Sequence, residues 1–170
     1  VSLLSGAGTG TTDANIDASA VTYGLELRGN DGDNVLTGTA FADTIAGRAG
    51  ADVIDGGAGA DIMSGGADAD RFVISSFVEN YGSGPADAIL DFTIGDDKID
   101  LSALDAIEGD PSSSFSFSTG IGLGTVSIEA GAAPGDVRVV IAPDASIADY
   151  MVINAHITNG TTLTAQDFIL

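Results

Sequence analysis

The sequence predicts an all-β protein in which a parallel β-roll is followed by a small antiparallel β-sandwich cap. A gap-free period of nine residues runs from Gly29 to Val73, and beyond Pro111 apolar and polar residues alternate between Gly-, Pro- and Asp-containing breaks. These patterns divide the chain into an N-terminal flank at 1–28, which is a candidate degenerate coil of the roll, the nonapeptide roll at 29–73 and the cap at 74–170.

The composition restricts the partners of the chain. Its 170 residues include 25 acidic and 5 basic residues, for a net charge of -20. Such a surface repels phosphate backbones and anionic lipids, and no apolar run is as long as a membrane span. We therefore expect no nucleic acid partner and no stable membrane insertion. The acids are 21 Asp and only 4 Glu, a bias that favours oxygen ligands held in tight turns.

The period consists of five consecutive blocks: GNDGDNVLT, GTAFADTIA, GRAGADVID, GGAGADIMS and GGADADRFV. Position one is always Gly, position eight is always apolar, and position six is Asn34, Asp43, Asp52, Asp61 and Asp70. Each block reads as a six-residue turn and a three-residue strand whose central side chain points inward. A single block cannot bury that side chain, so the blocks must stack into a solenoid. Stacking aligns the carboxylates in rows that require a cation.

These blocks resemble the GGxGxDxUx nonapeptide of the repeats-in-toxin proteins, also called hemolysin-type repeats. The resemblance implies a calcium-loaded parallel β-roll in which two blocks form one coil. It also implies that Ca²⁺ lies between turns two blocks apart, pairing Asn34 with Asp52, Asp43 with Asp61, and Asp52 with Asp70, with about three or more ions in all. The implied metal ligands, carboxylates and turn carbonyls together, are Asn34, Asp43, Gly47, Ala49, Gly50, Asp52, Gly56, Gly57, Ala58, Gly59, Asp61, Gly65, Ala67 and Asp70.

Departures from the nonapeptide pattern indicate how strongly each turn should bind calcium. Asn34 lacks a charge, and Thr39 and Phe41 replace both inner glycines of the second turn. Arg48 and Asp68 each replace one glycine in later turns. We expect the first turn to bind calcium most weakly, because its position-six side chain is neutral.

The segment ADAILDFTIGDDKIDLSALDAI, which begins at Ala86, is similar to the stretch that follows the β-roll in serralysin-type secreted proteases and in the repeat modules of alginate epimerases. A strand containing Ile89 and Phe92 would cap the open end of the solenoid. We expect its acids to be solvated or paired with Lys98 rather than to bind calcium. Residues 101–107 are the one short helix that the sequence predicts.

The residues for catalysis are missing from this sequence. A serralysin-type protease needs an H-E-x-x-H helix, whereas this chain has one histidine, His156, in an alternating strand. No serine occupies a G-x-S-x-G elbow. We therefore expect the chain itself to have no enzymatic activity, and its parent to be a secreted protease, lipase or epimerase.

The last four residues, DFIL, look like the C-terminal export signal of type I secreted proteases, although a final strand would give the same pattern. Together, these features predict a non-catalytic C-terminal module that folds on calcium outside a bacterial cell and supports type I secretion, with the exporter as its partner. Two alternatives remain open: a polysaccharide-binding repeat module of an alginate epimerase-like enzyme, and the terminal part of a surface-layer or adhesin protein. The sequence leaves the oligomeric state open.

Overall fold

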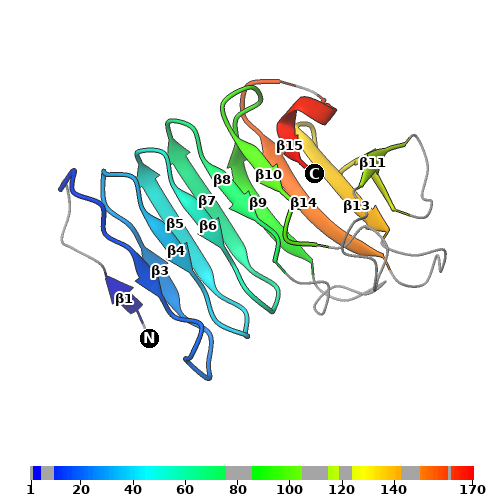
Figure 1. The fold of residues 1–170 in the computed structure, drawn as a ribbon. Helices are drawn as coiled ribbons and strands as arrows, with labels where there is room; N and C mark the ends of the chain where they lie inside the picture. The colour runs from blue at the N-terminus through cyan, green and yellow to red at the C-terminus, as the bar shows by residue number, and fades with distance from the viewer. Residues whose placement is uncertain are drawn as a thin grey trace.

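A computed structural model describes residues 2–4, 10–75, 86–104, 115–118, 124–142, 150–160 and 162–170. Its strands are β1 (Ser2–Leu4), β2 (Ile16–Asp17), β3 (Glu26–Arg28), β4 (Val35–Thr37), β5 (Thr44–Ala49), β6 (Val53–Asp55), β7 (Ile62–Ala67), β8 (Arg71–Val73), β9 (Asp87–Phe92), β10 (Lys98–Asp100), β11 (Ser116–Phe117), β12 (Thr125–Ala130), β13 (Asp136–Ala142), β14 (Met151–Ile157) and β15 (Phe168–Ile169). They form two sheets, in the orders β1-β3-β5-β7-β9-β14-β13-β12-β11 and β15-β10-β8-β6-β4-β2. Figure 1 shows the roll as a stack of coils that continues into the cap.

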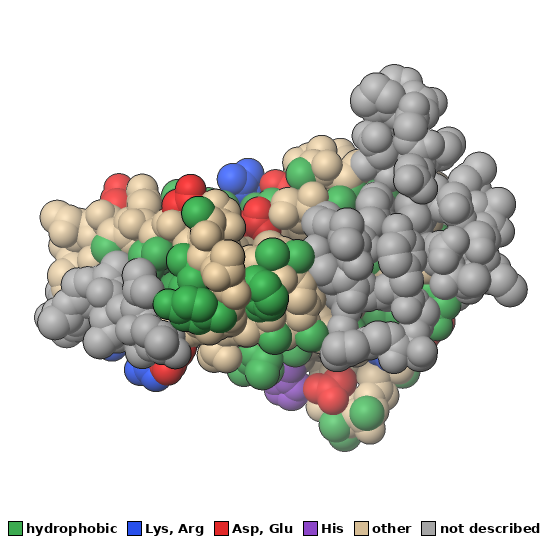
Figure 2. Space-filling view, turned by 90° about the horizontal axis from the view of Figure 1, so that it is seen from below, with side chains coloured by type: hydrophobic (Ala, Val, Ile, Leu, Met, Phe, Trp, Pro, Cys, Tyr) green, Lys and Arg blue, Asp and Glu red, His purple; other side chains and the backbone are tan. Residues whose placement is uncertain are grey.

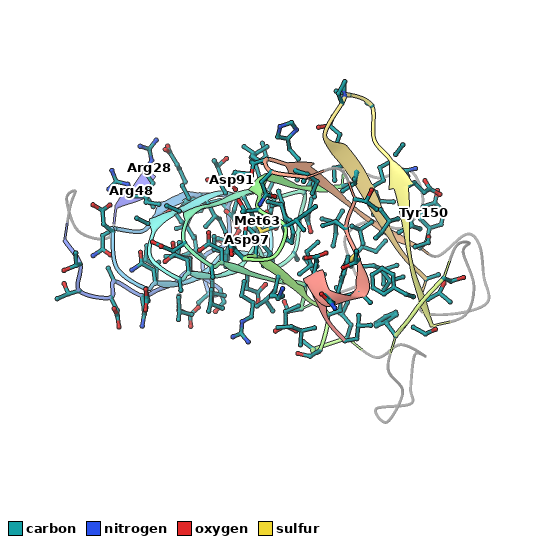
Figure 3. The ribbon with its side chains drawn as sticks, turned by 90° about the horizontal axis from the view of Figure 1, so that it is seen from above. Arg28, Arg48, Met63, Asp91, Asp97 and Tyr150 are labelled. Atoms are coloured by element: carbon teal, nitrogen blue, oxygen red, sulfur yellow. The ribbon has the colours of Figure 1, made fainter. Side chains whose placement is uncertain are left out.

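The roll is parallel, as the nonapeptides predict. Successive short strands alternate between the two sheets, and each strand pairs in parallel with the strand one coil away, as β5 does with β7 and β6 with β8. The position-eight side chains form the core: Leu36, Ile45, Ile54, Met63 and Phe72 are each at most 1% exposed. Met63 lies between the two sheets (Figure 3). One inward side chain per strand therefore suffices to fill this narrow interior.

The stack of coils extends beyond the five nonapeptides on both sides. Before them, Leu27 pairs with Ile45 and Ile16 pairs with Leu36. After them, Ile89 pairs with Met63, and Ile99 pairs with Phe72. The inward apolar row therefore continues through β9 and β10, where paired coils are separated by 26 or 27 residues instead of 18.

The cap contains the expected antiparallel strands, but it continues the sheets of the roll. β12, β13 and β14 are antiparallel neighbours, and β14 joins β9 of the roll in parallel. β15 joins β10 in the other sheet. The expected small sandwich is thus not a separate pair of sheets, because its strands satisfy the edges that the roll would otherwise leave open.

Two local expectations differ from the structure or fall outside it. Leu101–Leu104, the described part of the expected helix, is a turn closed by a hydrogen bond of 3.0 Å from Leu104 N to Leu101 O, and residues 105–107 lie outside the described residues. The helical turn of the described chain is instead a short 3-10 helix at Ala165–Asp167. None of the helical structure in the described ranges could cross a membrane.

Candidate metal centre

The position-six side chains form a buried ladder along the roll. Asn34, Asp43, Asp52, Asp61 and Asp70 are all at most 3% exposed. The last three accept a hydrogen bond from the backbone N–H of the position-six residue one coil earlier: Asn34 N lies 2.7 Å from Asp52 Oδ1, Asp43 N lies 2.8 Å from Asp61 Oδ1, and Asp52 N lies 2.9 Å from Asp70 Oδ1. The structure therefore brings together each of the three pairs that the nonapeptide resemblance implies.

In two turns of this ladder, the second oxygen of the position-six carboxylate accepts no hydrogen bond within the described chain. Oδ2 of Asp52 and Oδ2 of Asp70 are buried and have no hydrogen-bond partner among the described residues. Burying an ionised oxygen without a partner costs free energy, so binding of a cation or a proton to either atom would stabilise the fold.

The turns fall into two conformations. In the turns 47–52, 56–61 and 65–70, the residues at positions two and four have positive φ, including the non-glycine residues Arg48 at 103° and Asp68 at 77°. In the turns 29–34 and 38–43 no residue has positive φ, and the position-two N–H points back at the position-six side chain. Three turns thus share the shape that the glycine pattern predicts, and two are closed by a local hydrogen bond.

This closure separates the first two turns from the others. Thr39 N donates to Asp43 Oδ2 at 2.6 Å. Asn30 N donates to Asn34 Oδ1 at 2.7 Å, and Asn34 Nδ2 donates to Asn30 Oδ1 at 3.0 Å. The position-six side chain of the first turn, Asn34, is neutral and is satisfied within the turn, so we keep the prediction that this turn binds calcium most weakly.

Glycine at position one leaves room for the carboxylate of its own turn. A Cβ added at Gly47 would lie 2.1 Å from Asp52 Oδ2 and 2.7 Å from the carbonyl oxygen of Gly65. The same addition at Gly56 would lie 2.3 Å from Asp61 Oδ2, and at Gly65 it would lie 2.1 Å from Asp70 Oδ2. Carboxylate and carbonyl oxygens therefore converge in a space that any larger residue would occupy.

The remaining expected ligands are backbone carbonyls of the same turns. Gly50, Gly57 and Gly59 hold positive φ values of 99°, 85° and 125°. Ala49 and Ala67 end β5 and β7 and pair with each other in register, and Ala58 N donates to Thr39 O at 3.1 Å. The turns thus place these residues in successive layers of the stack.

Two ladder residues were absent from the sequence-based site. Asp87 and Asp97 are at most 4% exposed, and each accepts a backbone N–H at 2.9 Å, from Asp61 and Asp70 respectively. Their signal was present in the sequence, because each precedes an inward isoleucine by two residues, as position six precedes position eight. The expected pairing with Lys98 is not what the structure shows at Asp100, which pairs with Arg71 at 3.3 Å.

Burial and crowding raise the pKa of several of these carboxyl groups. Loss of solvent raises the pKa of Asp52 to about 6 and that of Asp70 to about 7, with further contributions from neighbouring carboxylates. Burial also raises the pKa of Asp91 and of Asp97, against the backbone hydrogen bonds that they accept. Without a metal, the ionised forms of these carboxyl groups are therefore destabilised.

The donor set fits a hard cation. Among the residues described, no three carboxylate, imidazole or thiol groups form a ready-made metal cluster. An ion between two turns would therefore take carboxylates from the ladder and complete its shell with turn carbonyls. Six to eight oxygens in flexible geometry suit Ca²⁺, whereas Mg²⁺ requires a tighter octahedron.

The two turn edges of the roll differ in chemistry. Asp33, Asp68 and Asp96 line an open depression of about 500 Å³ on one edge. On the other edge, hydrophobic side chains gather over the middle of the roll (Figure 2). Phe41, in the turn 38–43, is 46% exposed. The surface acids thus concentrate beside the turns 47–52 and 65–70, where they add to the attraction for a cation.

Comparison with known proteins agrees with this geometry. Residues 28–63 and 37–72 match the family described as RTX calcium-binding nonapeptide repeat (4 copies). The roll is therefore built of RTX nonapeptide repeats. A search of curated proteins found no match.

Two solved structures resemble this chain over both the RTX roll and the cap. The AlgE6R3 subunit of the Azotobacter vinelandii mannuronan C5-epimerase is 25% identical, with a TM-score of 0.62, over 91% of this chain and 83% of that one. The AlgE6R2 subunit shares the fold, with 24% identity and a TM-score of 0.64 over 86% of this chain and 87% of that one. The chain is thus a calcium-binding repeat module with a β-roll fold.

Proposed function

We propose that this chain is a non-catalytic module that folds on calcium outside a bacterial cell and supports type I export of the protein to which it belongs. The observation that carries the proposal is the buried oxygen of Asp52 and of Asp70 that no described residue satisfies. In a chain with a net charge of -20, repulsion opposes compaction until a cation neutralises the ladder. Calcium binding then supplies the folding free energy.

The position of the last strand supports the link to export. Phe168 is 7% exposed, and it packs edge-on against Phe117 with ring centroids 4.9 Å apart. β15 also pairs with β10. Folding therefore encloses the segment that resembles an export signal, and an exporter that reads an extended peptide would meet it only in the unfolded chain.

The first experiment records circular dichroism and the radius of gyration in chelator, in millimolar calcium and in millimolar magnesium at matched ionic strength. We expect an expanded chain in chelator and in magnesium, and a compact β-rich chain in calcium. Matched ionic strength separates specific binding from screening. The same compact state in all three solutions would refute calcium-dependent folding.

A second experiment addresses export. The chain is fused to the C-terminal end of a passenger in cells that carry a type I exporter, and the secreted fraction is measured. We expect secretion to fall when residues 167–170 are removed and to survive Leu170→Ala, which changes an exposed side chain. Equal secretion of the fusion with and without residues 167–170 would remove these residues from the signal.

A polysaccharide-binding module is the second candidate, favoured by the 25% identity to the AlgE6R3 subunit of a mannuronan C5-epimerase. Charge weighs against an acidic polymer, because Arg28, Arg71 and Arg138, three of the five basic residues, already pair with acids. Titration of the calcium-loaded chain with mannuronan oligomers, followed by NMR, tests this candidate. No shift beyond that produced by a neutral oligomer would exclude it.

A further inference from the structure

One turn edge of the roll carries no exposed charge. Hydrogen bonds between successive position-six residues stack the turns 20–25, 38–43 and 56–61 on this edge, which we call the neutral edge. Asp43 and Asp61 are the only charged residues in these three turns, and both are buried. The rest of each turn consists of Gly, Ala, Val, Thr, Leu, Tyr and Phe. Such a surface is unusual in a chain with a net charge of -20.

The opposite turn edge is acidic. Its turns carry five carboxylates that are exposed or half-buried, namely Asp13, Asp31, Asp33, Asp68 and Asp96. A basic partner would be attracted to that edge, and a second acidic molecule would be repelled from it. A partner that binds the neutral edge gains nothing from opposite charge, so it must present a surface that is itself uncharged.

Two exposed aromatic side chains lie on the neutral edge, one coil apart. Tyr23 and Phe41 are 50% and 46% exposed, and both occupy position four of their turns. Gly59 holds this position in the next turn, where an added Cβ would lie 2.6 Å from the backbone carbonyl carbon of Phe41. Ile62, which follows that turn, is also exposed. Figure 2 views the roll from this side, with hydrophobic side chains over its middle. Aromatic groups without charged neighbours are typical of the centre of a protein interface.

The turn 38–43 is held by polar contacts, not by the Phe41 side chain. Phe41 N donates to Thr39 Oγ1 at 3.0 Å, and Thr39 N donates to Asp43 Oδ2 at 2.6 Å. The other carboxylate oxygen of Asp43 accepts Leu25 N at 2.5 Å, which ties this turn to the one before it. The folded roll thus presents this surface ready-made, which lowers the entropy cost of docking.

We propose that the neutral edge is the contact surface between two copies of this chain. A two-fold interface requires one patch to fit itself, and an uncharged patch meets its copy without repulsion. Neighbouring strands are about 4.8 Å apart, so Tyr23 and Phe41 form a row into which the rings of a second copy can pack. Three turns make a narrow strip, so we expect a weak dimer that forms at high protein concentration. The proposal goes beyond the proposed function, because it concerns the folded chain and not its export.

The first test measures sedimentation of the whole calcium-loaded chain from micromolar to millimolar concentration. It compares the wild type with Phe41→Ser and with Leu90→Ser, whose side chain is equally exposed and apolar but lies in β9 of the sheet. We expect the dimer of Phe41→Ser to be at least about tenfold weaker and that of Leu90→Ser to be unchanged. A wild type that stays monomeric throughout, or equal dissociation constants in all three chains, would overturn the proposal.

A second pair of variants covers the case in which Phe41→Ser alters its turn. Ala42 and Ala51 are both exposed and both hold position five of a turn, on the neutral and the acidic edge respectively. Ala42→Glu and Ala51→Glu therefore add the same charge at matched places, and circular dichroism in calcium verifies that both fold. We expect Ala42→Glu to lose the dimer and Ala51→Glu to keep it. The opposite result, or equal association, would contradict the proposal.

Added salt gives an independent readout of what joins the copies. Salt screens the long-range repulsion between two acidic chains, so a dimer formed through the neutral edge should become tighter in added sodium chloride at fixed calcium. A dimer that weakens with salt would mean that ion pairs or calcium bridges between acidic surfaces hold the copies together, and the proposal would be wrong.

Discussion

Asp70 accepts the backbone N–H of Asp52 at 2.9 Å through one carboxylate oxygen, while its other oxygen is buried with no hydrogen bond from the described residues. Asp52 is built in the same way, one coil earlier. One oxygen therefore ties the coils together, and the other has no partner among the described residues. This division makes the calcium-free roll sensitive to any change that alters the charge of the ladder.

The calcium-free roll should become more stable as the pH falls. The pKa of Asp52 is raised to about 6 and that of Asp70 to about 7 in the folded chain, above the value of the unfolded chain. Protonation therefore favours the fold, and this stability is lost as the pH rises through about 6 to 7. The radius of gyration in metal-free buffer between pH 4 and pH 8 measures it, because the expanded chain should become more compact as the pH falls. In calcium the trend should reverse, because protons displace the metal. A metal-free chain that expands on acidification would contradict this reading.

Asp52→Asn should have opposite effects with and without calcium. The amide keeps an oxygen for Asn34 N but loses the charge, so the calcium-free chain should gain stability and the calcium-loaded chain should lose it. Loss of one site at calcium 100-fold above its dissociation constant removes about 2–3 kcal/mol. Chemical unfolding in calcium and the radius of gyration in chelator measure the two effects. Asp13→Asn, on an exposed side chain outside the nonapeptides, is the control and should change the free energy of unfolding in calcium by no more than about 0.5 kcal/mol.

Gly47→Ala should disrupt the turn in the calcium-loaded chain. The new methyl group would lie 2.1 Å from Asp52 Oδ2, closer than any real contact allows, so the coil must shift. We expect a loss of at least about 2 kcal/mol in calcium, measured by chemical unfolding. Gly10→Ala, where the nearest atom is 3.6 Å away, should be nearly neutral. A Gly47→Ala chain as stable as the Gly10→Ala chain would show that the turn has more room than its geometry indicates.

Arg48→Gly should stabilise the chain. Arg48 adopts a φ of 103°, which is costly for any residue with a Cβ, and glycine removes that cost. We expect a gain of about 1 kcal/mol, seen as a higher urea midpoint in calcium. Arg71→Gly, in strand β8, where φ is negative, should instead lower the midpoint. Equal losses in the two variants would mean that contacts of the Arg48 side chain outweigh the relief of backbone strain.

Phe168→Ala and Leu170→Ala should differ strongly although they lie two residues apart. Phe168 is 7% exposed and contacts Phe117, whereas Leu170 is 39% exposed. We expect losses of about 3 kcal/mol for Phe168→Ala and under about 0.5 kcal/mol for Leu170→Ala. Thermal unfolding in calcium provides the comparison. Similar losses in the two variants would contradict the burial of Phe168 in the last strand.

The sequence was most informative where one residue type repeats at one position. Leu36, Ile45 and Ile54 each recur nine residues after the previous inward side chain, so the parallel roll and its core could be predicted. The buried ladder could be predicted because position six is conspicuous in a turn of glycines. The conformational difference between the turns at Thr39 and Arg48 is less visible, because both residues replace a glycine and only Arg48 takes its positive φ.

The sequence was least informative where the period changes. Asp97 lies 27 residues from its ladder partner Asp70 instead of 18, so a search for nine-residue blocks ends before it. The cap was predicted as a separate sandwich because alternation shows that a segment is a strand, not which strand it pairs with. The pairing of β14 with β9 depends on side-chain fit between distant segments, which no local pattern records.

The sequence separation of paired strands also indicates that the roll and the cap form at different rates. Within the roll each coil closes on residues 18 positions earlier, so coils can be added one after another once the first has formed. The cap requires much larger loops to close, as between Thr93 and Thr158, which are 65 residues apart and have hydroxyl oxygens 3.0 Å apart. Contacts of such high order form slowly. We therefore expect closure of the cap to limit the rate at which the chain reaches its native state.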